Sequence, residues 1–123
     1  MNLIQLSTAS LAVLLSACVA GPTPSTLVSG PPDAVYTSDK AAKAIADCII
    51  DKWENTQVIG SGAIANARPT STGYRATMHF AEKLMYLAEI DETKFGSKTK
   101  IYVNPSMVSL GKNPTVGQAA NCQ

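Results

Sequence analysis

Residues 38–55 have the sequence SDKAAKAIADCIIDKWEN, and this segment has the clearest helical periodicity in the chain. Apolar residues recur at helical spacing along it, and charged residues occupy the opposite side. Ser38 is a suitable N-cap, and the pattern predicts that the helix ends near Asn55. Asp39 and Lys43 are spaced for a favourable i,i+4 ion pair. The expected inward-facing residues are Ala41, Ala42, Ile45, Cys48, Ile49 and Trp53.

After this helix the hydrophobic period changes to two, which predicts β-strands. The clearest strand is YRATMHF, residues 74–80, because apolar and polar side chains alternate along it. We expect its apolar side to pack on the helix and its polar side to face water. The expected buried group is Tyr74, Met78 and Phe80 with Ile45, Ile49 and Trp53, and the expected water-facing group is Arg75, Thr77 and His79.

Three further segments are expected to be strands. Residues 58–68 form the first of them, with Gly60 and Gly62 marking a bulge or bend, and residues 98–103 form the last. Residues 84–90 fit either a helix or a strand, and we favour a strand because turn residues follow at 94–97. A short helix is expected near residues 116–122.

These elements predict a single small α+β domain over residues 38–123. In it, one N-terminal helix packs on an antiparallel sheet of three to four strands, which gives two layers. Aromatic residues make up only 6% of the chain, so the core must depend mainly on Ile, Val, Leu, Met and Ala. A small core of this kind often needs a covalent staple.

The N-terminal region has a different character. An apolar run over residues 3–15 is too short to span a bilayer, and it ends in Leu15-Ser16-Ala17-Cys18. This tetrapeptide resembles the lipobox of bacterial lipoproteins. The resemblance implies that residues 1–17 are a signal peptide and that cleavage leaves Cys18 as a lipidated N-terminus. No Lys or Arg precedes the apolar run, and the alternative is a buried helix with Cys18 as a core thiol.

The lipobox resemblance also implies where the protein resides. Acyl chains on Cys18 would hold it on a membrane, because several chains together bind stably. Val19 follows the cysteine in place of the Asp that retains many such proteins at the inner membrane. The periplasmic face of the outer membrane is therefore expected. Residues 18–37 contain four prolines together with Gly, Ser and Thr, which predicts a flexible tether.

If Cys18 is lipidated, Cys48 and Cys122 remain as a pair in an oxidising compartment. We expect a disulfide between them, with the two Cα atoms about 4.4–6.8 Å apart. The alternative is a buried free thiol at Cys48 and a free thiol at the C-terminus. No third ligand of suitable spacing accompanies the two cysteines, so a zinc site is not expected.

A search for catalytic chemistry finds little. His79 is the only histidine, on the expected water-facing side of its strand, and Asp91 and Glu92 are adjacent and would point to opposite faces. Ser61 lies between two glycines without the residues of a nucleophile elbow, and Trp53 is expected to be a core anchor. No phosphate-binding loop or metal-ligand spacing occurs. We therefore expect no enzyme activity, no cofactor and no bound metal.

The formal net charge of +1 argues against a dedicated nucleic-acid-binding protein. The sequence favours an outer-membrane-anchored periplasmic lipoprotein with a structural or protein-interaction role in the cell envelope. Its partners would be the membrane, through Cys18, and another envelope protein. The alternative is a periplasmic inhibitor, for example of lysozyme, or a ligand-binding lipoprotein.

Overall fold

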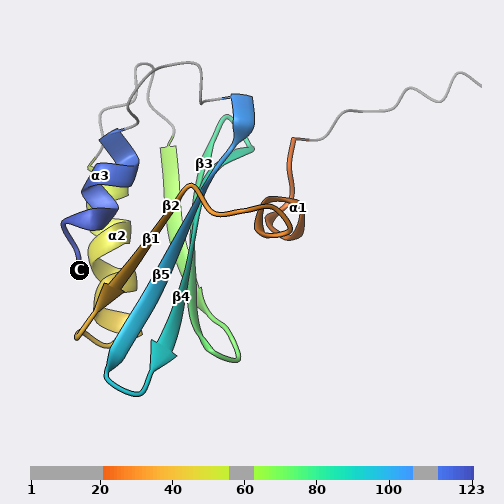
Figure 1. Ribbon diagram of the computed structural model, residues 1–123. Helices are drawn as coiled ribbons and strands as arrows, with labels where there is room; N and C mark the ends of the chain where they lie inside the picture. The colour runs from red at the N-terminus through yellow and green to blue at the C-terminus, as the bar shows by residue number, and fades with distance from the viewer. Residues whose placement is uncertain (1–20, 56–62, 107–113) are drawn as a thin grey trace, which may run out of the picture.

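The computed structural model describes residues 21–55, 63–106 and 114–123 (Figure 1). In these ranges an antiparallel five-stranded sheet runs in the order β1-β5-β4-β3-β2. Helices α2 and α3 lie together on one face of the sheet, and α1 lies on the other (Figure 1). The elements are α1 (Pro24–Val28), β1 (Ala34–Ser38), α2 (Ala42–Glu54), β2 (Ala63–Pro69), β3 (Gly73–Phe80), β4 (Lys83–Thr93), β5 (Gly96–Val103) and α3 (Pro114–Ala120).

The α+β class is confirmed, but the expected architecture is imprecise. The sheet has five strands instead of three to four, and helices pack on both of its faces. Two of the unexpected elements, α1 and β1, lie in the segment 18–37 that was expected to be a tether, and β1 extends one residue beyond it to Ser38. The prediction of a flexible tether is therefore wrong from Pro24 onward.

The prolines of this segment are compatible with the structure because of their positions. Pro24 stands in the first turn of α1, where its missing N–H costs no helical hydrogen bond. The Thr23 side chain caps that turn by accepting a hydrogen bond from the backbone N–H of Thr26. Pro31 and Pro32 precede β1, whose residues then pair with β5 from Ala34 to Ser38. Proline density was therefore a poor indicator of a disordered segment.

Helix α2 begins at Ala42 and not at Ser38, which is the last residue of β1. The Ser38 hydroxyl accepts a hydrogen bond from Lys40 N–H, and the start of the helix is capped from β4 instead. There the Glu92 carboxylate accepts a hydrogen bond of 2.9 Å from Ala42 N–H. A cap supplied by a residue so distant in sequence leaves no local pattern. The helix ends at Glu54 with Asn55 as its C-cap, so the predicted end near Asn55 is confirmed.

The later start of α2 also changes its ion pairs. Asp39 precedes the helix, so the expected pair with Lys43 is replaced by one between Lys43 and Asp47 at 2.7 Å. The Lys43 ammonium donates a hydrogen bond to the Asp47 carboxylate, which raises the pKa of Lys43. Both side chains are exposed, and such surface pairs contribute little to stability.

The main core lies between α2 and the sheet. Ile45, Ile49, Trp53 and Met78 are buried in it, as expected, and the rings of Trp53 and Tyr86 lie 6.0 Å apart. Tyr74 and Phe80 are only partly buried at its margin, so the prediction of full burial is wrong for these two residues. A smaller cluster on the opposite face consists of Leu27, Leu84, Leu87 and Tyr102.

The segment at residues 84–90 is a strand, as favoured from the sequence. It packs on both sides, because Tyr86, Ala88 and Ile90 belong to the main core while Leu84 and Leu87 belong to the smaller cluster. Burial on both sides removes the apolar–polar alternation that identifies a one-sided strand. This explains why the sequence left helix and strand open here.

The predicted disulfide is present between Cys48 and Cys122, with the two Cα atoms 5.8 Å apart. It links the middle of α2 to the residues after α3. Helix α3 overlaps the C-terminal helix expected near residues 116–122, but it begins at Pro114 and ends at Ala120. The Lys40 ammonium donates hydrogen bonds of 3.1 and 3.2 Å to the carbonyls of Cys122 and Gln123. The C-terminal segment is therefore fixed to α2 covalently and to the start of α2 by hydrogen bonds.

Candidate functional site

The residues expected to carry lipidation and processing, Cys18 and residues 1–17, lie outside the described residues, as do Val58, Ile59 and Ser61. Within the described ranges, no helix is long and apolar enough to cross a membrane. The candidate site must therefore be sought on the folded domain itself.

The adjacent carboxylates Asp91 and Glu92 have different hydrogen-bond partners. Asp91 accepts a hydrogen bond of 2.6 Å from the Thr72 hydroxyl, whereas the neighbouring Glu92 caps α2. Trp53 is fully buried in the core. Among residues 21–55, 63–106 and 114–123, no three His, Cys, Asp or Glu side chains are grouped so that they could hold a metal ion.

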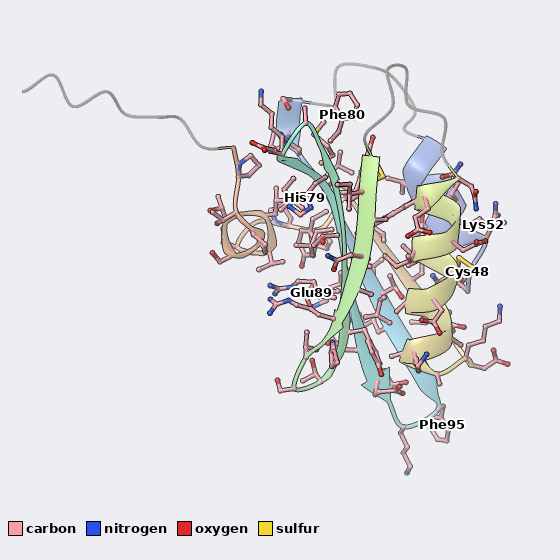
Figure 2. All side chains as sticks on the ribbon, turned by 180° about the vertical axis from the view of Figure 1, so that it is seen from behind. Cys48, Lys52, His79, Phe80, Glu89 and Phe95 are labelled. Carbon is pink, nitrogen blue, oxygen red and sulfur yellow. A yellow bond between two sulfur atoms is a disulfide. The ribbon has the colours of Figure 1, made fainter. Side chains whose placement is uncertain are left out.

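The sheet face that points away from α2 is more polar than the face that packs on α2. Figure 2 shows His79 and Glu89 on this polar face, on the opposite side of the sheet from Cys48 and Lys52 of α2. Arg75, Thr77 and His79 were expected to face water, but the structure shows all three half-buried, so the expected exposure is too high. Arg75 forms an ion pair with Glu89 across β3 and β4, and their side chains are only 18% and 15% exposed. The sequence offered no sign of this pair, because its two residues lie on different strands.

The strand register extends this ion pair into a row. Arg68 on β2 pairs with Arg75, Glu89 pairs with Lys100 on β5, and all four residues lie side by side across the sheet. Arg68 is exposed and Lys100 is half-buried. Three cations and one carboxylate leave this row with an excess of positive charge. We call Arg68, Arg75, Glu89 and Lys100 the charged row.

Exposed apolar side chains mark other possible contact points. In the described part of the chain, the exposed large apolar residues are Val35 at 47%, Ile64 at 65% and Phe95 at 82%. Val35 and Ile64 lie on the two edge strands, β1 and β2, where a partner strand could be added. Phe95 lies in the turn between β4 and β5, with the Lys94 ammonium 5.5 Å from its ring centroid (Figure 2).

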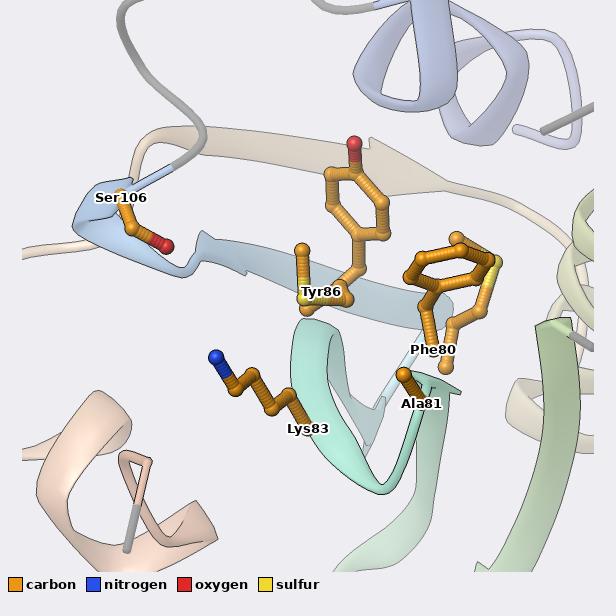
Figure 3. Close-up of a pocket in the computed structure, with 7 residues that line it drawn as sticks. Phe80, Ala81, Lys83, Tyr86 and Ser106 are labelled. Atoms are coloured by element: carbon orange, nitrogen blue, oxygen red, sulfur yellow. The ribbon is translucent and has the colours of Figure 1, made fainter. Parts of the chain in front are cut away.

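An open apolar hollow of about 330 Å³ lies at the other end of β4, beside the turn that joins it to β3. Its lining is mainly methionine and aromatic side chains (Figure 3). We call this space the apolar hollow, and it is formed by Met78, Phe80, Ala81, Lys83, Met85, Tyr86 and Ser106.

A second, more polar hollow of about 470 Å³ adjoins it on the α1 side. His79 and Glu82 contribute to its wall, together with the residues that lead into α1. Ala81 and Lys83 line both hollows, so the β3–β4 turn separates them. Neither hollow could be recognised from the sequence, because each is formed by residues that come together only in the folded chain.

Comparison of the chain with protein-family models, with curated proteins and with solved structures finds no match.

Proposed function

We propose that this protein is a lipoprotein, anchored through Cys18 to the periplasmic face of the outer membrane, whose domain binds another envelope protein. The resemblance of Leu15-Ser16-Ala17-Cys18 to a lipobox supports the anchor. The disulfide between Cys48 and Cys122 supports an oxidising compartment, because such bonds persist there and are rare in the cytosol.

The observation that carries the interaction role is the exposure of Phe95. An aromatic side chain that is 82% exposed contributes almost nothing to the core, yet aromatic residues are enriched at the centres of protein interfaces. Phe95 stands on a hairpin turn held by two long paired strands, β4 and β5, which fixes its position before a partner arrives. A preorganised aromatic residue loses little conformational entropy on binding.

The position of Phe95 relative to the N-terminus fits an anchored protein. Strand β4 has 11 residues and extends from the turn near α1 to the turn that holds Phe95. At the rise of an extended strand, this separates the two turns by roughly 35 Å. Since α1 follows closely on Cys18 in the sequence, the Phe95 turn would be directed away from the membrane and towards periplasmic partners.

The anchor and the interaction are tested separately. Replacing Cys18 by Ala should leave the precursor uncleaved and without acyl chains, as intact mass would record. For the interaction, a photo-crosslinking amino acid is placed at position 95 in living cells, with the exposed position of Glu54 on α2 as the matched control. One defined envelope protein should be crosslinked from position 95 and not from position 54.

The Phe95→Ala variant should lose this partner in a pull-down while keeping the melting temperature of the wild type. Crosslinking of the same mixture of proteins from both positions would contradict the interaction role. Normal processing of the Cys18→Ala variant to a soluble product would contradict the anchor, and it would leave the interaction role to its own test.

The apolar hollow favours the second candidate function, a ligand-binding or inhibitory lipoprotein. A concave, mostly apolar site with few polar groups is typical of small-molecule binding. Addition of the purified protein to lysozyme and to unrelated periplasmic hydrolases would test the inhibitory form. Stoichiometric loss of one hydrolase activity would support an inhibitor over an envelope-interaction role.

A further inference from the structure

We propose that the apolar hollow binds the aliphatic chain of an anionic amphiphile of the fatty-acid class. The chain would lie against Met78, Met85 and Tyr86, and its anionic end would lie at Lys83. The inference does not depend on lipidation of Cys18 or on a protein partner at Phe95.

The floor and wall of the hollow are suited to an aliphatic chain. Met78, Met85 and Tyr86 belong to the main core, and Phe80 packs against it. Because core packing fixes these side chains, the shape of the hollow is largely formed before a ligand binds. The volume of about 330 Å³ lies within the range of small-molecule sites. Methionine side chains adapt to irregular apolar ligands, because they are unbranched and polarisable.

The charge around the hollow selects an anionic end group. Lys83 is the only charged residue in its lining, and within the described residues Lys83 forms no ion pair. Figure 3 shows its side chain extended beside the hollow. A lysine can pack its methylene stem along an apolar ligand while its ammonium stays in water. Glu82 lines only the neighbouring polar hollow, so none of the described residues that form the apolar hollow is a carboxylate that would repel an anion.

The turn at the rim of the hollow has an unusual backbone. Ala81 and Glu82 both have positive φ angles, 48° and 65°. Two-residue hairpin turns of this kind normally use Asn or Gly, because other residues are strained there. Ala81 nevertheless presents a side chain to the lining of the hollow. Strained residues gather at ligand sites more often than elsewhere, and this position fits that tendency.

The test is a titration of the full-length purified protein with dodecanoate below its micelle concentration, followed by calorimetry and by tryptophan and tyrosine fluorescence. We expect one saturable site per chain. Shortening the ligand to decanoate and octanoate should weaken binding by up to about fourfold for each methylene removed. Dodecyltrimethylammonium has a chain of the same length but a cationic end, and it should bind more weakly than dodecanoate.

Two charge-reversal variants provide a matched comparison. Lys83→Glu changes the hollow, whereas Lys94→Glu makes the same change at the opposite hairpin. Dodecanoate binding should fall at least fivefold in the first variant and stay unchanged in the second. The cationic ligand should bind the Lys83→Glu variant more tightly than the wild type. Lys83 is exposed, so the fold should be retained, and Lys83→Gln serves if Lys83→Glu does not fold.

A blocking variant tests the position of the chain itself. Ser106 is an exposed residue in the lining, and Ser106→Trp should fill the hollow and abolish dodecanoate binding. Equal losses in the Lys83→Glu and Lys94→Glu variants, or no saturable binding to the wild type, would overturn the proposal. Binding to vesicles of an anionic phospholipid without any binding of monomeric dodecanoate would also overturn it, in favour of a membrane-surface contact.

Discussion

The two faces of the sheet are covered very differently. On one face lies α2, a 13-residue helix, together with α3 and the disulfide, over a continuous apolar core. On the other face lies α1, which has five residues and contributes Leu27 to a cluster that, among the described residues, holds four buried side chains. The remainder of this second face carries the charged row. The first face therefore supplies most of the stability, whereas the second leaves surface open for contacts with other molecules.

The difference follows from elementary helix energetics. A helix as short as α1 has no stability of its own in water, and it persists only through contacts such as those of Leu27. Helix α2 places a full apolar side against the sheet over several turns. Local opening of α1 is therefore expected at a lower free energy than opening of α2.

The largest expected effect is on the α2 face. Trp53→Ala removes a fully buried indole that contacts the Tyr86 ring, and it should lower the free energy of unfolding by about 3–5 kcal/mol. Urea denaturation followed by far-UV circular dichroism would measure this loss. A change below about 1 kcal/mol would show that the main core does not depend on α2 as we describe.

The second prediction concerns the disulfide, which closes a segment with a sequence separation of 74 residues. The loop-entropy model gives such a crosslink about 4.5 kcal/mol of stability, before any strain in the folded state is subtracted. Reduction should therefore lower the melting temperature by several degrees or more and leave most of the α2 helicity in place. A Cys48→Ser, Cys122→Ser variant is the matched control, since a reducing agent should have no effect on it. Two free thiols in the unreduced protein would contradict the bond.

The third prediction addresses the α1 face. Leu27→Ala should cost about 2 kcal/mol, at the low end for buried leucines, because the helix it holds is small and at the edge of the structure. Hydrogen exchange should show loss of protection in α1 while the amides of α2 stay protected. Val28→Ala, at a partly buried neighbour, is the control and should have a smaller effect. Equal loss of protection in α1 and α2 would mean that the two faces unfold as one unit.

The same comparison shows what could be predicted from the sequence. Local periodicity correctly indicated the body of α2 and the strands at residues 74–80 and 98–103, because in each case the pattern of burial is set within one segment. At residues 84–90 the periodicity left helix and strand open, and the turn residues that follow favoured the strand. Cysteine counting indicated the disulfide. The capping of α2 by Glu92 and the pairing of β1 with β5 depend on contacts between segments far apart in the sequence. No local pattern contains that information.

The candidate sites were less predictable than the fold. His79 and Arg75 were expected on a water-facing strand surface, but Arg75 is paired with Glu89, and His79 lies in the wall of a hollow that includes residues near α1. The apolar hollow combines the β3–β4 turn with Ser106, which follows β5. Counting outward from the turn at residues 81–82 would pair Arg75 with Ala88, but a register shift between Met78 and His79 places Glu89 opposite Arg75 instead. The charged row therefore could not be read from the sequence. Phe95 was expected only as a residue of the turn at 94–97, and its 82% exposure became apparent from the structure.

The smallest expected effect is at the β3–β4 turn, between the two hollows. Ala81 has a φ of 48°, a conformation that costs an alanine roughly 1–2 kcal/mol and a glycine almost nothing. Replacing the alanine by glycine would remove this cost, but glycine also increases the entropy of the unfolded chain, which offsets about 0.5–1 kcal/mol of the gain in stability. Ala81→Gly should therefore raise the free energy of unfolding by about 0.5 kcal/mol, measured as a higher urea midpoint.

The control is Ala44→Gly on the exposed side of α2. There the same change should lower the free energy of unfolding by about 1 kcal/mol, because the backbone is helical. If Ala81→Gly raises the free energy of unfolding and Ala44→Gly lowers it, the alanine side chain strains the turn but stabilises the helix.

Equal destabilisation by both changes would contradict the left-handed conformation at Ala81, and with it the argument that the rim of the apolar hollow is strained.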